Sequence, residues 1–140
     1  MPEVFVGDRG IIQPQWEKGP IEQELDELPG HAARLGFEIP DFVRAYESAS
    51  LEDLSDEDWF SMRNCDTREG QTWTVEAMKE YRGYERDIND IEKRMRGHDS
   101  VYAPSVLFRE GHEPFLIGGN TRLMMCTALK IRPKVVAVRM

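Results

Sequence analysis

The sequence predicts an α/β fold, in which short helices are followed by a small sheet. Three observations predict this fold. Between residues 74 and 96, apolar side chains recur every three or four positions, which is the period of an α-helix. After Gly97 the pattern changes to short apolar runs separated by turn residues, which is typical of strands. The run Val135–Val138 is rich in β-branched residues and suits a buried strand. Helices and strands therefore follow one another in the second half of the chain.

Length and composition indicate a globular chain with one core. A chain of 140 residues, 40% hydrophobic and 31% charged, is long enough for one well-buried domain. We expect a single domain over residues 1–140, with a mainly helical, acidic extension at 1–58 and an α/β core at 59–140. The chain has no apolar run of the ~20 residues that a membrane span needs, and its start does not resemble a secretion signal. We therefore expect a cytoplasmic protein with reduced cysteines, Cys65 and Cys126.

The net charge of −8 hides an uneven distribution. Residues 1–70 hold 17 acids and 6 bases, whereas residues 71–140 hold 9 acids and 12 bases. From residue 114 to residue 140 there is no acid, and the bases are Arg122, Lys130, Arg132, Lys134 and Arg139. The overall charge argues against a general nucleic-acid binder, while the local excess favours an anion site in this last segment.

The first seventy residues are predicted to form short helices separated by loops. Pro20 is placed in the first turn of a helix that ends at Pro29 and Gly30. Pro40 opens a second helix, whose apolar face holds Phe42, Val43, Tyr46 and Ala49. Ser50 and Ser55 each precede an acid by three residues, which is typical of a helix start.

The second half is predicted element by element from its changing periods. After the helix at 74–96 we expect strands at 104–108 and 114–117, joined by a hairpin at 109–113 that contains a glycine. A helix follows at 121–129, and the last strand covers 134–139.

The turn between the second of these strands and the next helix has the residues of an anion site. Gly118 and Gly119 permit a positive φ and a close approach of the backbone to a ligand. Asn120 or Thr121 is expected to cap the helix, whose first N–H groups then point outward. Arg122 adds donors suited to phosphate or carboxylate oxygens. The alternative is a plain capped turn with a surface arginine.

The second half resembles the ParB/sulfiredoxin superfamily. In that family a helix leads into a strand that begins at a proline, and a hairpin, a glycine- and arginine-containing turn, a helix and a closing strand follow. The resemblance covers about residues 74–140. It rests on Ile91–Met95, Gly97, Pro104–Leu107, Phe115–Ile117, Gly118–Arg122, Ala128, Leu129, Ile131 and Val135–Val138.

The resemblance implies nucleotide binding, with CTP in ParB and ATP in sulfiredoxin and the related free-serine kinases, together with Mg²⁺. Gly119 and Arg122 fall on the family's phosphate-holding glycine and arginine, and Gly118 matches the first glycine of the sulfiredoxin turn. Asn120 stands where sulfiredoxin has its reactive cysteine, so sulfiredoxin chemistry is not expected. Thr121 replaces a His or Arg that often touches phosphate, which puts strong triphosphate binding in doubt.

An upstream box of the family, a strand followed by Asn and Arg, has a loose counterpart in residues 59–68. Asn64 and Arg68 are then further nucleotide-binding candidates. A kinase also needs a carboxylate to accept the proton of the acceptor hydroxyl, and Asp66 and Glu69 are the nearest candidates for a catalytic role. These residues would make the protein an ATP- or CTP-dependent phosphotransferase acting on a small molecule or nucleoside.

Two other functions remain open. The basic C-terminal segment favours a ParB-like DNA-binding or nuclease protein, although the acidic first half argues against it. The acidic half instead favours a non-catalytic phage or bacterial accessory protein that binds a host protein. No metal site is expected, because the histidines are scattered. The acids at 52–58 are typical of a solvated helix start.

Overall fold

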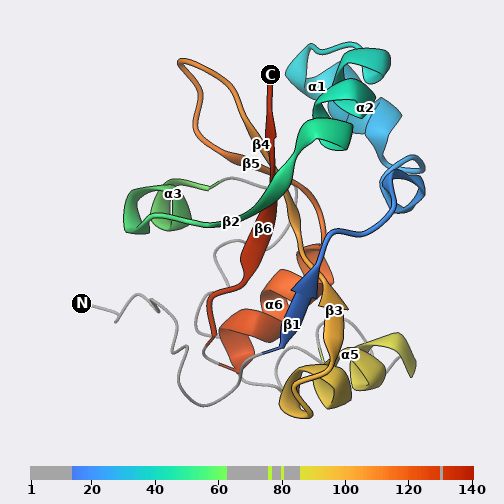
Figure 1. Ribbon diagram of the computed structural model, residues 1–140, viewed down its shortest axis with the longest axis vertical. Coiled ribbons are helices and arrows are strands. Elements are labelled where there is room, and N and C mark those ends of the chain that lie inside the picture. Colours follow the sequence, from blue (N-terminus) through green and yellow to red (C-terminus); the bar gives the residue numbers. More distant parts are fainter. Residues whose placement is uncertain (1–13, 63–75, 77–79, 81–85, 130) are drawn as a thin grey trace.

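The computed structural model describes residues 14–62, 76, 80, 86–129 and 131–140, and Figure 1 shows how their elements are arranged. In chain order the elements are β1 (Gln15–Glu17), the 3₁₀ helix η1 (Ile21–Gln23), α1 (Leu28–Leu35), α2 (Ile39–Ser48), β2 (Ser50–Asp53), α3 (Asp56–Ser61), α5 (Arg86–Arg96), β3 (Ser100–Tyr102), β4 (Ser105–Phe108), β5 (Phe115–Gly118), α6 (Asn120–Ala128) and β6 (Lys134–Arg139). Helices and strands are mixed along the chain, as the sequence predicts.

The strands form one sheet of four and one of two. The larger sheet has the order β2-β6-β4-β5, in which β6 runs parallel to β4 while β2 and β5 are antiparallel to their neighbours. Ser105 pairs with Val136 and Leu107 with Val138, so the centre of the sheet is made from the two most apolar strands. The smaller sheet pairs β1 with β3 in parallel.

Both faces of the larger sheet are buried, and neighbouring residues on its strands face opposite sides. Leu107 and Val136 pack with Leu28 of α1 and Phe42 of α2. Their neighbours Val106 and Val135 pack on the other side. There they meet a group made by α3, α6 and the loops beside them: Leu54, Trp59, Met62 and Leu123. The continuous apolar runs in β4 and β6 are explained by this double cover.

A third apolar cluster joins α5 and α6 to the smaller sheet. Met95 of α5, Val101 of β3, and Met125 and Cys126 of α6 are all buried in it. Figure 1 shows α5 and α6 toward one end of the molecule and α1 and α2 toward the other. The start of α6 therefore lies where the larger sheet meets the smaller one.

The predicted elements of the second half are largely confirmed. The strands at 104–108 and 114–117 are β4 and β5, which pair as a hairpin, and the predicted helix and last strand are α6 and β6. The predicted helix at 74–96 is confirmed over Arg86–Arg96, and residues 76 and 80 are also helical. The other residues of that predicted helix lie outside the described residues.

The prediction for the first half is wrong because it misses two strands. The sequence predicts helices and loops there, whereas Gln15–Glu17 and Ser50–Asp53 are strands. Ser50 therefore begins a strand and not a helix, while Ser55 does cap α3, because its Oγ accepts a hydrogen bond from Asp58 N at 3.1 Å. Both segments become strands because they pair with segments far away in the sequence. A local hydrophobic period does not reveal such pairing.

Two further predictions are corrected. Pro29 does not end a helix but lies in the first turn of α1, where its missing N–H costs no hydrogen bond. Trp59 does not belong to a strand of the upstream box. It lies in α3 and is fully buried. Gly36 ends α1 with a φ of 76°. Pro40 lies in the first turn of α2, as predicted.

Among the described helices, none combines the length and the apolar character needed to cross a membrane.

Candidate functional site

The turn between β5 and α6 is built around a glycine that no other residue replaces without strain. Gly119 has a φ of 91° and precedes the first residue of α6. A Cβ at Gly119 would lie 2.9 Å from Pro104 Cα and 3.0 Å from Arg122 Nη2. The backbone of Gly119 therefore packs directly on the loop before β4, in a left-handed conformation that favours glycine.

Gly119, and not Asn120 or Thr121, is the N-cap of α6. The predicted side-chain cap is therefore wrong, because Asn120 and Thr121 already belong to the helix. Leu123 N donates to Gly119 O at 2.8 Å, which is the first bond of the helix. The N–H groups of residues 120–122 have no carbonyl acceptor within the helix, because they lie in its first turn. This end of α6 therefore carries the partial positive charge of the helix dipole.

Arg122 folds back from α6 over the turn. Its Nη1 donates to the carbonyl oxygen of Tyr102 at 2.6 Å, which fixes the guanidinium between β3 and the turn. Burial lowers the pKa of Arg122, and the nearby carboxylate of Glu24 partly opposes this effect. An arginine remains charged in proteins at any ordinary pH, so the turn holds a fixed cation.

A buried acid, Glu24, faces the same turn. Glu24 follows η1 and is 6% exposed, and a Cβ at Gly118 would overlap its carboxylate. Ser105 Oγ donates to Glu24 Oε1 at 3.4 Å. Burial raises the pKa of Glu24, while Arg122 and the hydrogen bond from Ser105 act in the opposite direction. The site thus pairs a cation with an acid that takes up a proton more readily than an exposed glutamate.

Tyr46 closes the site behind Glu24. Its hydroxyl donates to Gly19 O at 2.5 Å, and burial raises the pKa of this phenol, with the charge of Glu24 adding to the effect. Tyr46 is itself buried in the cluster formed by α1, α2 and the sheet. The acid is therefore positioned by packed elements and not by a free loop.

Sequence reasoning missed Glu24, although the sequence carries a signal for it. Glu24 lies three residues after Ile21 and four before Leu28, on the apolar side of that segment. Ile21 packs against the core, Leu28 is fully buried, and Glu24 lies between them. An acid at such a position indicates a buried carboxyl group with a specific partner.

The site residues predicted from the sequence fall into two groups. Gly118 ends β5, Gly119 precedes α6, and Asn120, Thr121 and Arg122 form the first turn of α6. Four others lie outside the described residues: Asn64, Asp66, Arg68 and Glu69. The structure therefore supplies a carboxyl group, that of Glu24, which the sequence analysis did not name.

A cavity of about 380 Å³ adjoins the turn. Arg122 and Tyr102 line one side of it, and Arg94 of α5 lines another. Glu17 of β1, Gln23 of η1 and Ser100 of β3 complete its polar lining, and Val101 and Ile91 are apolar. Its volume falls within the range of ligand pockets, and its arginines outnumber its acid.

The other C-terminal bases form ion pairs with the acids of residues 52–56. Arg139 contacts Glu52 through two hydrogen bonds of 2.5 and 2.8 Å, and Lys134 Nζ lies 3.9 Å from Asp53 Oδ2. Asp53 and Lys134 lie opposite each other in the pairing of β2 with β6, and Glu52 and Arg139 lie on the same two strands. The side-chain contact with Arg139 lowers the pKa of Glu52. The predicted excess of free bases is thus reduced by strand pairing.

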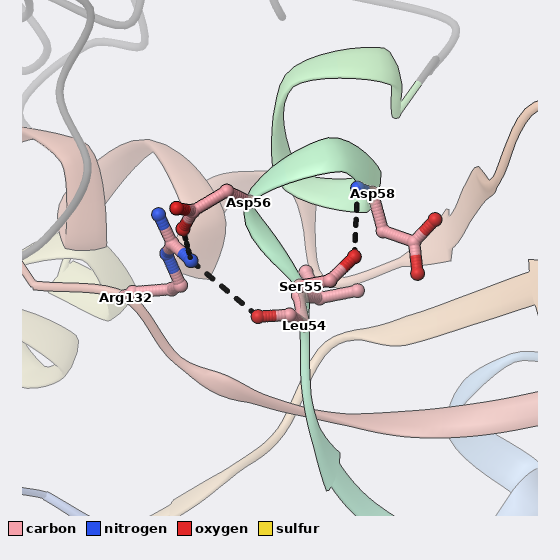
Figure 2. A network of polar contacts seen from close by, with 5 residues as sticks. All are labelled: Leu54, Ser55, Asp56, Asp58 and Arg132. Carbon is pink, nitrogen blue, oxygen red and sulfur yellow. Dashed lines mark hydrogen bonds and ion pairs between the residues drawn. The ribbon is translucent and has the colours of Figure 1, made fainter.

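Arg132 forms the most buried of these pairs (Figure 2). Its Nη1 donates to Asp56 Oδ1 at 2.7 Å and lies 3.4 Å from the carbonyl oxygen of Leu54. The guanidinium also lies over the ring of Trp59, 5.3 Å from its centroid. Arg132 therefore anchors the start of α3 to the segment before β6, whereas Lys130 lies outside the described residues.

The remaining reactive groups in the described part of the chain include a cysteine and a histidine. Cys126 is fully buried in α6, and burial raises the pKa of its thiol, so it is a core residue. His112 is exposed in the hairpin. Among the described residues no three His, Cys, Asp or Glu side chains gather to hold a metal ion.

Comparisons with protein-family models, with curated proteins and with solved structures find no match for this chain.

Proposed function

We propose that this protein binds a nucleoside phosphate at the turn formed by Gly118–Arg122, in a fold like that of the ParB/sulfiredoxin superfamily. The order of elements supports this proposal. A strand after a proline, a hairpin, a glycine turn, a helix and a closing strand follow one another as β4, β5, α6 and β6. These elements match the series on which the sequence resemblance rests.

The observation that carries the proposal is the geometry of Gly119 and Arg122. The backbone at Gly119 is held so close to Pro104 and to the guanidinium of Arg122 that a Cβ would have no room. The start of α6 and its arginine therefore present N–H donors at one place. Phosphate oxygens accept such donors, and the helix dipole favours their charge.

Glu24 would give the site a base for phosphoryl transfer. A bound ATP or CTP would supply the transferable phosphoryl group. Arg122 would bind its oxygens, and Glu24 would accept the proton of the attacking hydroxyl. Burial raises the pKa of Glu24, which makes this carboxyl a stronger base than an exposed one. Mg²⁺, which the family resemblance implies, would arrive bound to the phosphates of the nucleotide.

Calorimetric titration with ATP and CTP, each with Mg²⁺, tests the binding. Arg122→Ala is expected to weaken binding by about 10- to 150-fold, the effect of losing a hydrogen bond to a charged group. Arg109→Ala is a matched control, because Arg109 also donates to a backbone carbonyl, that of Leu35 at 2.7 Å, but does so away from the turn. If the wild type binds neither nucleotide, or if Arg122→Ala binds as the wild type does, the proposal is wrong.

A second measurement tests the phosphoryl transfer. If Glu24 is the base, Glu24→Gln keeps nucleotide affinity within a few-fold but loses phosphoryl transfer to nucleoside or small hydroxyl acceptors. Equal turnover by the wild type and Glu24→Gln would remove Glu24 from that role and leave the binding proposal in place.

The DNA-binding alternative receives less support from the structure. Three of the five C-terminal bases contact acids of residues 52–56, so their charge is already partly neutralised. A host-protein partner for the acidic half stays a prediction. The same ion pairs reduce the free acidic surface on which it was based.

A further inference from the structure

We propose that the cavity beside the turn receives the aromatic base of the bound nucleotide, and that Tyr102 is the surface on which the base stacks. This inference rests on the proposed nucleotide binding and adds the place and mode of base recognition. It starts from the shared lining of the cavity and the turn, because Arg122 belongs to both.

Tyr102 combines exposure with a fixed backbone. It is one of the few large apolar side chains that stay open to solvent, with 43% of its surface exposed. Its strand pairs with β1 at Glu17, and its carbonyl oxygen accepts the hydrogen bond from Arg122. The backbone of Tyr102 is therefore held beside the arginine that is proposed to bind phosphate.

One side of the Tyr102 ring is already covered. A Cβ at Gly19 would lie 3.1 Å from Tyr102 Cγ, so the backbone at Gly19 packs on the ring. The side chain of Gln23 contacts the same place. The ring is thus supported from behind while it lines the cavity. A supported, half-exposed ring favours stacking, because little conformational freedom is lost when a flat ligand binds.

The charges of the cavity indicate that its ligand is anionic as well as aromatic. Arg94 and Arg122 line it with two cations, against the single carboxylate of Glu17. Arg94 is half-exposed and forms an ion pair with Asp90, with 3.0 Å between its Nε and the carboxylate, so its charge is partly neutralised and Arg122 is the main cation of the cavity. A ring that stacks on Tyr102 and a phosphate at Arg122 are features of one molecule, a nucleoside phosphate.

The experiment compares ATP and CTP with inorganic tripolyphosphate, all with equal Mg²⁺, by calorimetry. We expect the nucleotides to bind the wild type at least 5-fold more tightly than tripolyphosphate. Tyr102→Leu should weaken nucleotide binding by about 5- to 150-fold, the range for loss of one stacked base, and leave tripolyphosphate unchanged. Tyr102→Phe keeps the ring and should bind as the wild type does.

Leu25→Ala is a matched control, because Leu25 is 42% exposed and does not line the cavity. An NMR measurement on the wild type needs no variant: the base protons should shift upfield through the ring current of Tyr102. This inference would be overturned if nucleotide and tripolyphosphate bind equally and Tyr102→Leu changes neither affinity. It would also be overturned if the base protons show no ring-current shift. Either result would leave phosphate binding standing. Binding of neither ligand would overturn the proposed function, and this inference with it.

Discussion

Substitution of Gly119 by alanine tests how the turn before α6 is built. Two separate costs are expected. The first is the left-handed conformation, since a φ of 91° costs a residue with a Cβ about 1–2 kcal/mol. The second is steric, because the new Cβ would lie 2.9 Å from Pro104 Cα and 3.1 Å from Pro104 Cβ. Forcing a methyl group into a packed backbone adds about 1–3 kcal/mol. We therefore expect Gly119→Ala to lower the free energy of unfolding by about 2–5 kcal/mol.

Gly36 provides the control for this substitution. Its φ is 76°, and a Cβ there would have nothing within 4 Å. Gly36→Ala therefore has the conformational cost without the steric one, about 1–2 kcal/mol. Each substitution also lowers the entropy of the unfolded chain by a similar amount, which cancels between them. Urea unfolding of both variants measures the difference directly, provided that the slope with urea is unchanged.

The assay has a second readout at the site itself. A methyl group at Gly119 would also lie 3.0 Å from Arg122 Nη2, so the guanidinium must shift. Binding of nucleotide by Gly119→Ala should then fall, while Gly36→Ala keeps it. Equal destabilisation by Gly119→Ala and Gly36→Ala would refute the proposed contact between the turn and Pro104.

Three further predictions concern buried groups. Burial raises the pKa of Glu24 above 4.5, so its contribution to stability is present below pH 4.5 and lost as the pH rises through its folded pKa. Urea unfolding should therefore show the wild type losing stability relative to Glu24→Gln across that window, and a difference independent of pH would contradict it. Arg132→Met should cost about 1–3 kcal/mol, because it leaves the Leu54 carbonyl without its donor and removes the contact with Trp59. Lys134→Met removes an exposed pair and should cost about 0–1 kcal/mol, and equal costs in thermal unfolding would argue against an anchoring role for Arg132. In a chain carrying Cys65→Ser, Cys126 should react with a thiol reagent only upon unfolding, and rapid reaction of the native protein would show that it is accessible.

The elements of the second half were predictable because each one carries its own period. The runs that became β4, β5 and β6 are short, apolar and bounded by proline or glycine, and both faces of their sheet are covered. The same sheet explains why these runs do not alternate between apolar and polar residues. The glycine turn was predictable because two adjacent glycines between a strand and a helix indicate a backbone conformation that other residues rarely adopt.

The strands of the first half were not predictable in the same way. Ser50–Asp53 contains a serine and two acids, which are poor strand formers on their own. The segment becomes a strand because Leu51 and Glu52 lie opposite Val136 and Val135 and because Arg139 binds the Glu52 carboxylate. Such pairing joins residues more than eighty positions apart. A local pattern does not contain it.

The candidate site was only half predictable for a related reason. Gly119 and Arg122 are neighbours in the sequence, so their pattern is visible in a short window. Glu24 reaches the same place from nearly a hundred residues away, through the packing of η1 beside the sheet. Pro29 misled the prediction because a proline both ends helices and begins them, and only the surrounding packing distinguishes the two.

The uneven charge of the sequence acquires a physical meaning in the fold. The acids that precede and begin α3 and the bases around β6 are far apart in the chain, yet β2 and β6 bring them into contact. Charges that neutralise each other in this way contribute little to attraction of a distant polyanion, since the field of each is largely cancelled by its partner. Arg122 differs from these bases, because its nearest acid, Glu24, is itself buried and has a raised pKa. Among the described bases of the last segment, Arg122 is the one that lies at the turn and lines its cavity, and this confined position favours a small anionic ligand over a long nucleic acid.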